Sequence, residues 1–128
     1  MRNFQSLDIW KKSHSFALSA YGLTSARFPK DEIYGLSSQL RRAATSIPMN
    51  IAEGCGRKTN ADFGHFLQIA AGSASEVEYQ LLLARDLGYI DANCCEEMSA
   101  RIVEIRKMIV AFISSLKTSK PRSGDLTP

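Results

Sequence analysis

The chain has 128 residues, of which 45% are hydrophobic and 23% are charged, and its formal net charge is +3 at pH 7. This length suits one domain rather than two, and the composition is close to the globular average, which excludes wholesale disorder and a fibrous repeat. No apolar run approaches the roughly 18 residues of a membrane-spanning helix, and the mildly basic charge permits a nucleic-acid partner without requiring one.

The cysteine and histidine content argues against a disulfide framework and against a metal site. Cys55, Cys94 and Cys95 are odd in number and two of them are adjacent, so no pairing pattern suggests itself. His14 and His65 each stand alone in their segments, without the ligand spacing of a metal site. The N-terminus lacks the uninterrupted apolar stretch of a signal peptide. We therefore expect a cytoplasmic protein that holds no metal and no cofactor and does not associate with a membrane.

Apolar spacing predicts the first helix over residues 8–28. Asp8 is a candidate N-cap, because its carboxylate can accept hydrogen bonds from the free amides of the first turn. Pro29 ends the segment, because the residue before a proline is pushed out of the helical region. Steps of three and four residues place one set of side chains on a single side of this helix: Trp10, His14, Ala17, Tyr21, Thr24 and Phe28. On this stripe we expect His14 to be a packed core histidine.

The second and third helices are predicted over residues 34–54 and 60–87. Gly54 and Gly56 suit the C-terminus of the second helix, where a residue in the left-handed conformation usually closes the last turn. The third helix has the longest regular apolar pattern: Phe63, Leu67, Ala70, Ala74, Val77, Leu81, Ala84 and Gly88. The small residues 70–75 in its middle predict a tight crossing with a neighbouring helix, because small side chains let backbones approach closely.

The fourth helix, predicted over residues 91–116, carries two apolar stripes side by side. The second stripe, Val103, Val110 and Ile113, makes the apolar face broader than one partner helix would cover. Short connections favour antiparallel neighbours, and strand signals are absent. We therefore predict an all-α fold, an antiparallel up-down-up-down four-helix bundle over residues 1–116, followed by a disordered polar tail over residues 117–128. The second stripe also leads us to expect an oligomer.

Polar residues follow one side of the second helix and one side of the third. They are Arg42, Ser46, Asn50, Glu53 and Arg57 on the second helix, and Ser73, Glu76 and Gln80 on the third. The turn between these helices is centred near Arg57 and Lys58. Antiparallel pairing then puts Arg42 near Ser73 and Glu76. We interpret the set as a hydrogen-bonded cluster that fixes the register of the two helices, and the alternative is a polar groove that holds a ligand.

No constellation of catalytic residues is apparent in the sequence. Nucleophilic catalysis needs a nucleophile, a base within hydrogen-bond reach and a group that orients the base. Neither histidine is paired with a serine or cysteine and an acid in a known arrangement. There is also no phosphate-binding loop, dinucleotide fingerprint or Glu-x-x-His pair for a di-iron site. We therefore expect a binding protein rather than an enzyme.

Basic residues are the candidates for contact with a nucleic acid. They are Arg41, Arg57, Lys58, Arg101, Arg106 and Lys107. Each cluster alone is ordinary for a protein surface, whereas a shared face would sum phosphate contacts into sequence-independent, salt-sensitive affinity. Base-specific readout is not supported, because no aromatic RNA-binding motif, zinc finger or obvious helix-turn-helix occurs.

Four stretches of the sequence are distinctive: residues 39–54 (QLRRAATSIPMNIAEG), residues 66–76 (FLQIAAGSASE), the opening Phe4-x-x-Leu7-x-x-Trp10, and residues 87–90 (LGYI). Over residues 4–112 the chain thereby resembles a bacterial four-helix-bundle family. Its members include proteins encoded in the intervening sequences of large-subunit ribosomal RNA genes, and the accessory variability protein of diversity-generating retroelements. The resemblance implies a left-handed bundle that assembles into a homopentamer with a positively charged surface. For the accessory members it implies a reverse transcriptase and nucleic acid as partners.

Two functional hypotheses follow from these observations. The first is a non-enzymatic oligomeric binding protein that contacts RNA or DNA through its basic surface, in one version as accessory to a partner enzyme such as a reverse transcriptase. The alternative is a self-assembling scaffold or protein-interaction module that does not bind nucleic acid.

Overall fold

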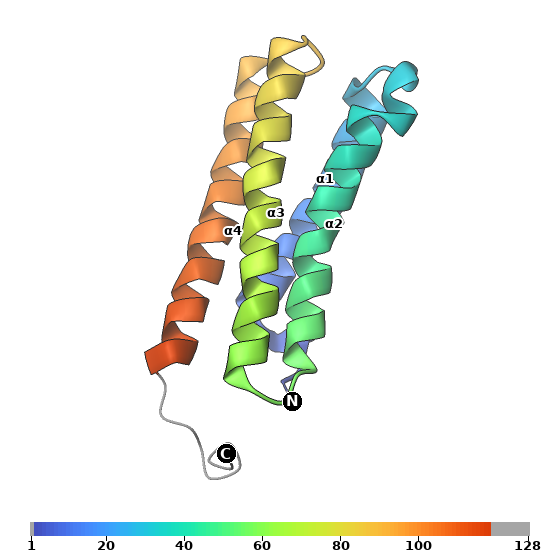
Figure 1. Cartoon of the computed structure of the whole chain (residues 1–128). Coiled ribbons are helices and arrows are strands. Elements are labelled where there is room, and N and C mark those ends of the chain that lie inside the picture. Colours follow the sequence, from blue (N-terminus) through green and yellow to red (C-terminus); the bar gives the residue numbers. More distant parts are fainter. Residues whose placement is uncertain (1, 119–128) are drawn as a thin grey trace.

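The computed structural model describes residues 2–118, which form helices joined by short connections (Figure 1). The α-helices are α1 (Asp8–Arg27), α2 (Leu36–Cys55), α3 (Asn60–Asp86) and α4 (Ala92–Thr118), and two 3-10 helices are η1 (Phe4–Ser6) and η2 (Lys30–Tyr34). No strand occurs between residues 2 and 118, so the all-α prediction is confirmed. Helix α4 continues past its predicted end at residue 116 to Thr118, and the remainder of the predicted tail lies outside the described residues.

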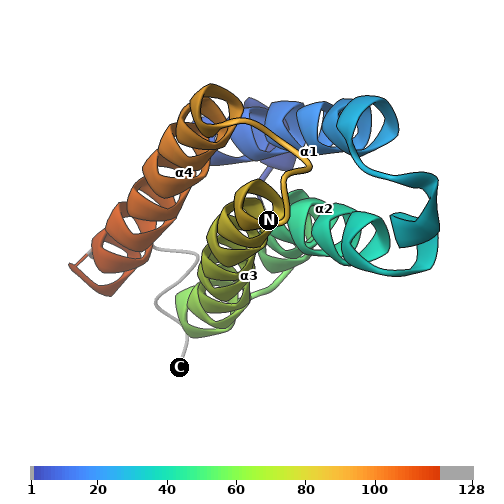
Figure 2. The ribbon, with the colours of Figure 1, turned by 90° about the horizontal axis from the view of Figure 1, so that it is seen from above.

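Each helix packs against the next one along the chain. The contacts between α2 and α3 and between α3 and α4 are the most extensive, and those between α1 and α4 are the least. Seen from above, α1 and α2 form one pair and α3 and α4 the other, with α2 and α3 adjacent (Figure 2). None of the helices within residues 2–118 combines the length and apolar character that crossing a membrane requires.

The core lies along the inner faces of all four helices. On α3 the predicted stripe is buried at Phe63, Leu67, Ala70, Ala74, Val77, Leu81 and Ala84. Gly88, the last member of that stripe, is exposed because it lies beyond the end of the helix. On α4 the second stripe divides, since Ile113 is buried whereas Val110 is 51% exposed.

Helix α1 buries only part of its predicted stripe: Ala17, Thr24 and Phe28 are buried, whereas His14 and Tyr21 are exposed. Its buried residues are Ile9, Ser13, Phe16, Ala17, Ala20 and Thr24. His14 is exposed and stacks on the Trp10 ring at 4.8 Å between centroids, so its prediction as a core histidine was wrong. Ser13, which lies outside the predicted stripe, can be buried instead, because its hydroxyl donates to the Trp10 carbonyl within the helix.

The predicted ends of α1 and α2 need correction. Leu7, not Asp8, is the N-cap of α1, because η1 delivers the chain to the helix through Leu7 in an extended conformation. Asp8 is the first helical residue, where its charge still complements the helix dipole. Gly56 closes α2 in a right-handed conformation, with φ −82°, and its N–H donates to the Glu53 carbonyl at 3.1 Å. The last turn of α2 therefore tightens instead of ending on a left-handed residue.

The left-handed cap occurs after α3, at Gly88, whose φ is 79°. The N–H of Tyr89 donates to the Ala84 carbonyl, and the N–H of Gly88 donates to the Arg85 carbonyl, both at 2.9 Å. These bonds form a Schellman motif, and a glycine suits its left-handed position because it has no Cβ.

The chain between α1 and α2 is fixed by Glu32 of η2. Its carboxylate accepts a hydrogen bond from the Leu36 N–H at 2.9 Å and another from the Tyr89 hydroxyl at 2.6 Å. Glu32 therefore caps α2, which begins at Leu36 rather than at residue 34, and joins this connection to the one between α3 and α4. The Tyr89 hydroxyl, together with the Leu36 N–H, lowers the pKa of the Glu32 carboxyl.

Candidate functional site

A hydrogen-bonded cluster joins the middle of α2 to the middle of α3. The hydroxyl oxygens of Ser46 and Ser73 lie 2.9 Å apart. The Asn50 amide donates to the Ser46 carbonyl at 2.8 Å and to its hydroxyl at 3.0 Å. Ala70 and Ala74, on either side of Ser73, are fully buried and let the two helices approach closely. The structure thus brings the three central polar residues together and fixes the register of α2 against α3.

Next to this cluster, toward η2, the two helices enclose a polar cleft of about 300 Å³. It is lined by Gln39, Arg42, Ala43, Ser46, Ser73 and Glu76. Arg42 and Glu76 are exposed, and within residues 2–118 no ion pair joins them. Glu53 lies apart from the cleft, because its carboxylate pairs with Arg57 at 3.0 Å.

Gln80 is the last residue of the polar side predicted for the third helix, one turn of α3 beyond Glu76. Its side chain is 3% exposed, and its Nε2 donates to the Glu76 carboxylate at 3.2 Å. Its Oε1 is buried without a hydrogen-bond partner among the described residues. The polar set between α2 and α3 is therefore not fully satisfied by the chain's own groups.

Two of the candidate basic residues are held against α1. Arg41 donates from its Nε to the Thr24 hydroxyl at 2.7 Å and lies over the Tyr21 ring, 4.8 Å from its centroid. Arg101 donates to the Ser19 hydroxyl at 3.0 Å and is half-buried. Both guanidinium groups therefore serve packing between helices as well as surface charge.

The other four candidates divide into paired arginines and free lysines. Arg106 pairs with Glu78 of α3 at 2.5 Å, and Arg57 pairs with Glu53 in the turn after α2. Lys58 and Lys107 are exposed and form no ion pair within the described residues. The six candidates are spread over several elements: Arg41 lies in the first half of α2, Arg57 and Lys58 lie in the connection after it, and the other three lie along α4.

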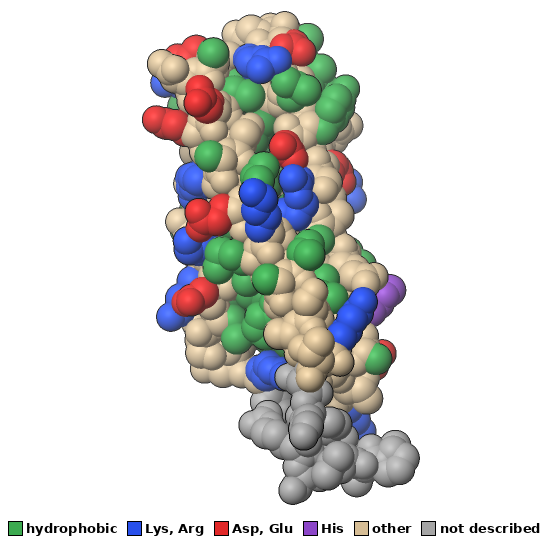
Figure 3. All heavy atoms as spheres, turned by 90° about the vertical axis from the view of Figure 1, so that its left-hand side faces the viewer, with side chains coloured by type: hydrophobic (Ala, Val, Ile, Leu, Met, Phe, Trp, Pro, Cys, Tyr) green, Lys and Arg blue, Asp and Glu red, His purple; other side chains and the backbone are tan. Residues whose placement is uncertain are grey.

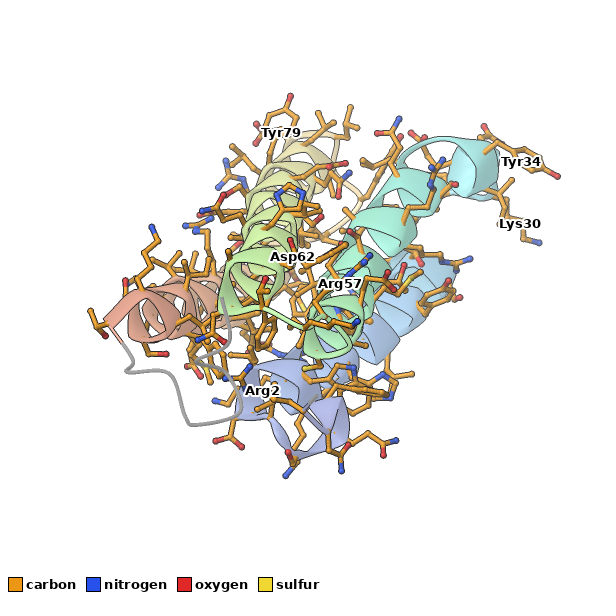
Figure 4. All side chains as sticks on the ribbon, turned by 60° about the horizontal axis from the view of Figure 1, so that its bottom comes forward. Arg2, Lys30, Tyr34, Arg57, Asp62 and Tyr79 are labelled. Atoms are coloured by element: carbon orange, nitrogen blue, oxygen red, sulfur yellow. The ribbon has the colours of Figure 1, made fainter. Side chains whose placement is uncertain are left out.

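Charge is distributed unevenly along the bundle. The end that contains η2 and the connection between α3 and α4 carries six acidic residues (Asp31, Glu32, Asp86, Asp91, Glu96 and Glu97) against three basic ones (Arg27, Lys30 and Arg85). On the face shown in Figure 3, acidic side chains are more frequent in the upper part and basic ones in the middle and lower parts, although both kinds occur in each. Figure 4 shows Arg2 and Arg57 at the opposite end of the molecule from Lys30 and Tyr34.

An apolar groove of about 350 Å³ lies between α1 and α2. Its walls include Trp10, Leu18, Tyr21, Pro48 and Met49, and its polar members are His14 and Thr45. Leu18 is 62% exposed and Met49 is 67% exposed, which is unusual for side chains that share one groove. The sequence did not reveal this groove, because Leu18 and Met49 lie outside the apolar faces predicted for the first two helices.

A second hollow, of about 410 Å³, lies between the first turns of α3 and the last turns of α4. It combines an apolar floor, which includes Gly64 and Leu116, with a rim that includes His65 and Lys117. Gly64 within a helix was the sequence signal available for it, since glycine weakens helices.

Two of the three thiols are poorly suited to act as nucleophiles. Burial raises the pKa of the Cys55 thiol and of the Cys94 thiol, so both are protonated near neutral pH and poorly nucleophilic. Within residues 2–118 no three metal-ligating side chains gather. The arrangement instead supplies hydroxyls, amides, cations and apolar grooves, which are groups that bind ligands non-covalently.

Comparison with known proteins places this fold in a family. Residues 5–111 match the family of 23S rRNA-intervening sequence proteins. One similar solved structure is the crystal structure of a protein of unknown function from the S23 ribosomal protein family of Bacteroides thetaiotaomicron. The two sequences are 31% identical, and the two structures superpose with a TM-score of 0.77. The similarity covers 83% of this chain and 95% of that one. No curated protein matches the sequence significantly. The chain therefore belongs to the family of 23S rRNA-intervening sequence proteins.

Proposed function

We propose that this chain is a non-enzymatic, cytoplasmic, oligomeric protein that binds RNA or DNA through the basic middle and lower parts of its bundle. The observation that carries this proposal is the uneven charge along the molecule. Lys58 and Lys107 are exposed, form no ion pair within residues 2–118, and lie away from the end that concentrates the acidic residues. Phosphates would be attracted to the basic part and repelled by the acidic end, which would orient a nucleic acid on the surface.

The proposal is tested by measuring affinity for a generic RNA and a generic DNA across a salt series. Affinity should fall steeply as salt rises, because each phosphate contact releases condensed counterions. Lys58→Gln and Lys107→Gln should each weaken binding and reduce the salt slope by about 1. Lys30→Gln is the matched control, because Lys30 is an exposed lysine at the acidic end. No binding at low salt, or equal effects of all three substitutions, would contradict the proposal.

The oligomeric part of the proposal rests on the apolar groove between α1 and α2. A groove in which Leu18 and Met49 are largely exposed is suited to burial against another copy of the chain. We propose the left-handed up-down-up-down bundle and the homopentamer that the family resemblance implies. Light scattering should give about five times the monomer mass, and Leu18→Asp should lower that mass. A wild-type monomer at micromolar concentration would contradict it.

A scaffold or protein-interaction module is the second candidate, and one observation favours it. Arg41, Arg57, Arg101 and Arg106 are all engaged by other side chains of the chain, so their charge is partly used internally. If the chain is such a module, Lys58→Gln and Lys107→Gln would leave the set of bound partners unchanged. A partner enzyme such as a reverse transcriptase fits either candidate.

A further inference from the structure

The hollow between α3 and α4 lies near the end of the bundle that is not acidic. Its floor is apolar: Ile113 is 9% exposed and Leu116 is 7% exposed. Its volume of about 410 Å³ is within the usual range for small-molecule sites. No acidic side chain lines it, so the site would not repel a phosphorylated ligand.

Gly64 keeps this hollow open. A Cβ built on Gly64 would meet no atom of residues 2–118 within 4 Å, so no neighbour among them requires a glycine there. Gly54 is the contrast, since a Cβ on it would lie 2.6 Å from the Phe63 ring. A glycine inside a helix lowers helix stability, and here the missing side chain leaves free volume at the surface.

The polar rim matches the chemistry of a nucleotide. The side-chain amides of Asn60 and Gln68 can each donate to and accept from the edge of a base. The His65 imidazole is exposed and offers a flat ring for stacking. The exposed Lys117 ammonium can hold the neighbouring phosphate.

We propose that this hollow binds one unstacked base of a single-stranded nucleic acid, with Lys117 on the adjoining phosphate. The proposal rests on the proposed nucleic-acid function and narrows it to single strands. A base in a duplex is paired and stacked on its neighbours, and cannot enter a pocket of this size without leaving the helix. The base edge is read by amides that can each donate or accept, so the pocket accepts more than one base.

The test uses two substitutions on the same helix. Gly64→Leu fills the hollow, and Gly72→Leu is the matched control, because Gly72 lies on α3 outside the hollow and a Cβ there also meets nothing within 4 Å. Both replace a helical glycine by a better helix former, so neither is expected to lower the melting temperature. Fluorescence anisotropy measures the affinity of the full chain for a labelled single-stranded RNA, the same sequence as DNA, and the corresponding duplexes.

Gly64→Leu should weaken binding to single strands by about tenfold, a loss comparable with removing one base-stacking contact. Its affinity for duplexes, and both affinities of Gly72→Leu, should stay at the wild-type level. If Gly64→Leu binds single strands as well as wild type does, the pocket proposal is overturned while the basic-surface function stands. If the wild-type chain binds neither form, both proposals fail. A change of oligomeric mass in Gly64→Leu alone, by light scattering, would instead assign the hollow to contacts between copies.

Discussion

Replacing Gly54 by alanine tests how closely α2 and α3 approach. A Cβ on Gly54 would lie 2.6 Å from one ring atom of Phe63 and 3.2 Å from the Cβ of Phe66. The Phe63 ring is 1% exposed and packs edge-on against Phe112, with centroids 5.5 Å apart, so it has little room to move. Because Phe66 is approached at its Cβ, close to the backbone, α2 and α3 must separate to admit the new methyl group.

The expected size of this effect follows from two opposing contributions. Alanine in place of a helical glycine stabilises by about 1 kcal/mol. Overpacking a rigid core costs about 1–3 kcal/mol, and here we expect the upper end, because both clashes involve poorly movable atoms. Gly54→Ala should therefore destabilise the fold by about 2 kcal/mol net. For a domain of this size that lowers the melting temperature by roughly 8 °C.

Gly72→Ala, on the neighbouring helix α3, is expected to stabilise the fold. Gly72 is exposed, and a Cβ there meets nothing within 4 Å, so only the gain in helix propensity applies. It should raise the melting temperature by roughly 4 °C. Thermal unfolding followed by circular dichroism, at one protein concentration for all variants, measures both shifts. If Gly54→Ala is also stabilising, the close approach of the two helices at Gly54 is refuted.

Two further perturbations test individual hydrogen bonds. The pKa of the Glu32 carboxyl is lower in the folded than in the unfolded chain, because its carboxylate accepts hydrogen bonds from Tyr89 and Leu36. These bonds stabilise the fold at pH values above the unfolded pKa of about 4.3. The stabilisation is lost as the pH falls through the folded pKa. The melting temperatures of wild type and Glu32→Gln should therefore converge between neutral pH and pH 3, and a constant difference would contradict the assignment. For the hydroxyl pair of Ser46 and Ser73, a double-mutant cycle with alanine should give a coupling of about 1 kcal/mol. Zero coupling in denaturant unfolding would show that each hydroxyl bonds to water instead.

The sequence predicted α3 better than α1 for a physical reason. On α3 the buried positions are apolar from Phe63 to Ala84, so burial and hydropathy give the same pattern. On α1 the buried Ser13 is polar, and its hydroxyl is satisfied by the Trp10 carbonyl of the same helix. A hydropathy pattern cannot register that local bonding. The aromatic and histidine stripe that it selected instead faces the groove beside α2.

The polar residues between α2 and α3 could be grouped from the sequence because their grouping depends only on register. A turn centred near Arg57 and Lys58 predicts Arg42 close to Ser73 and Glu76, and these three residues do line one cleft. The contact between the Ser46 and Ser73 hydroxyls, one turn further along α2, was not predicted. The partner of Arg42 did not follow from register in the same way. Its side chain is long enough to reach several groups, and in the structure it forms no ion pair with Glu76 among the described residues.

The candidate arginines contact other side chains of the chain, whereas the candidate lysines are exposed, and this difference follows from the chemistry of the two groups. A guanidinium group is planar and weakly hydrated, so it can lie over a ring or donate to a neighbouring hydroxyl at low desolvation cost. Arg41 and Arg101 do this at the seams that α1 forms with α2 and α4. An ammonium group is compact and strongly hydrated, and Lys58 and Lys107 are exposed without ion pairs among residues 2–118. Removing an arginine should therefore lower stability as well as charge, whereas removing one of these lysines should change the salt dependence of nucleic-acid binding alone. The lysines, rather than the more numerous arginines, are the residues through which the proposed phosphate contacts can be tested separately from the fold.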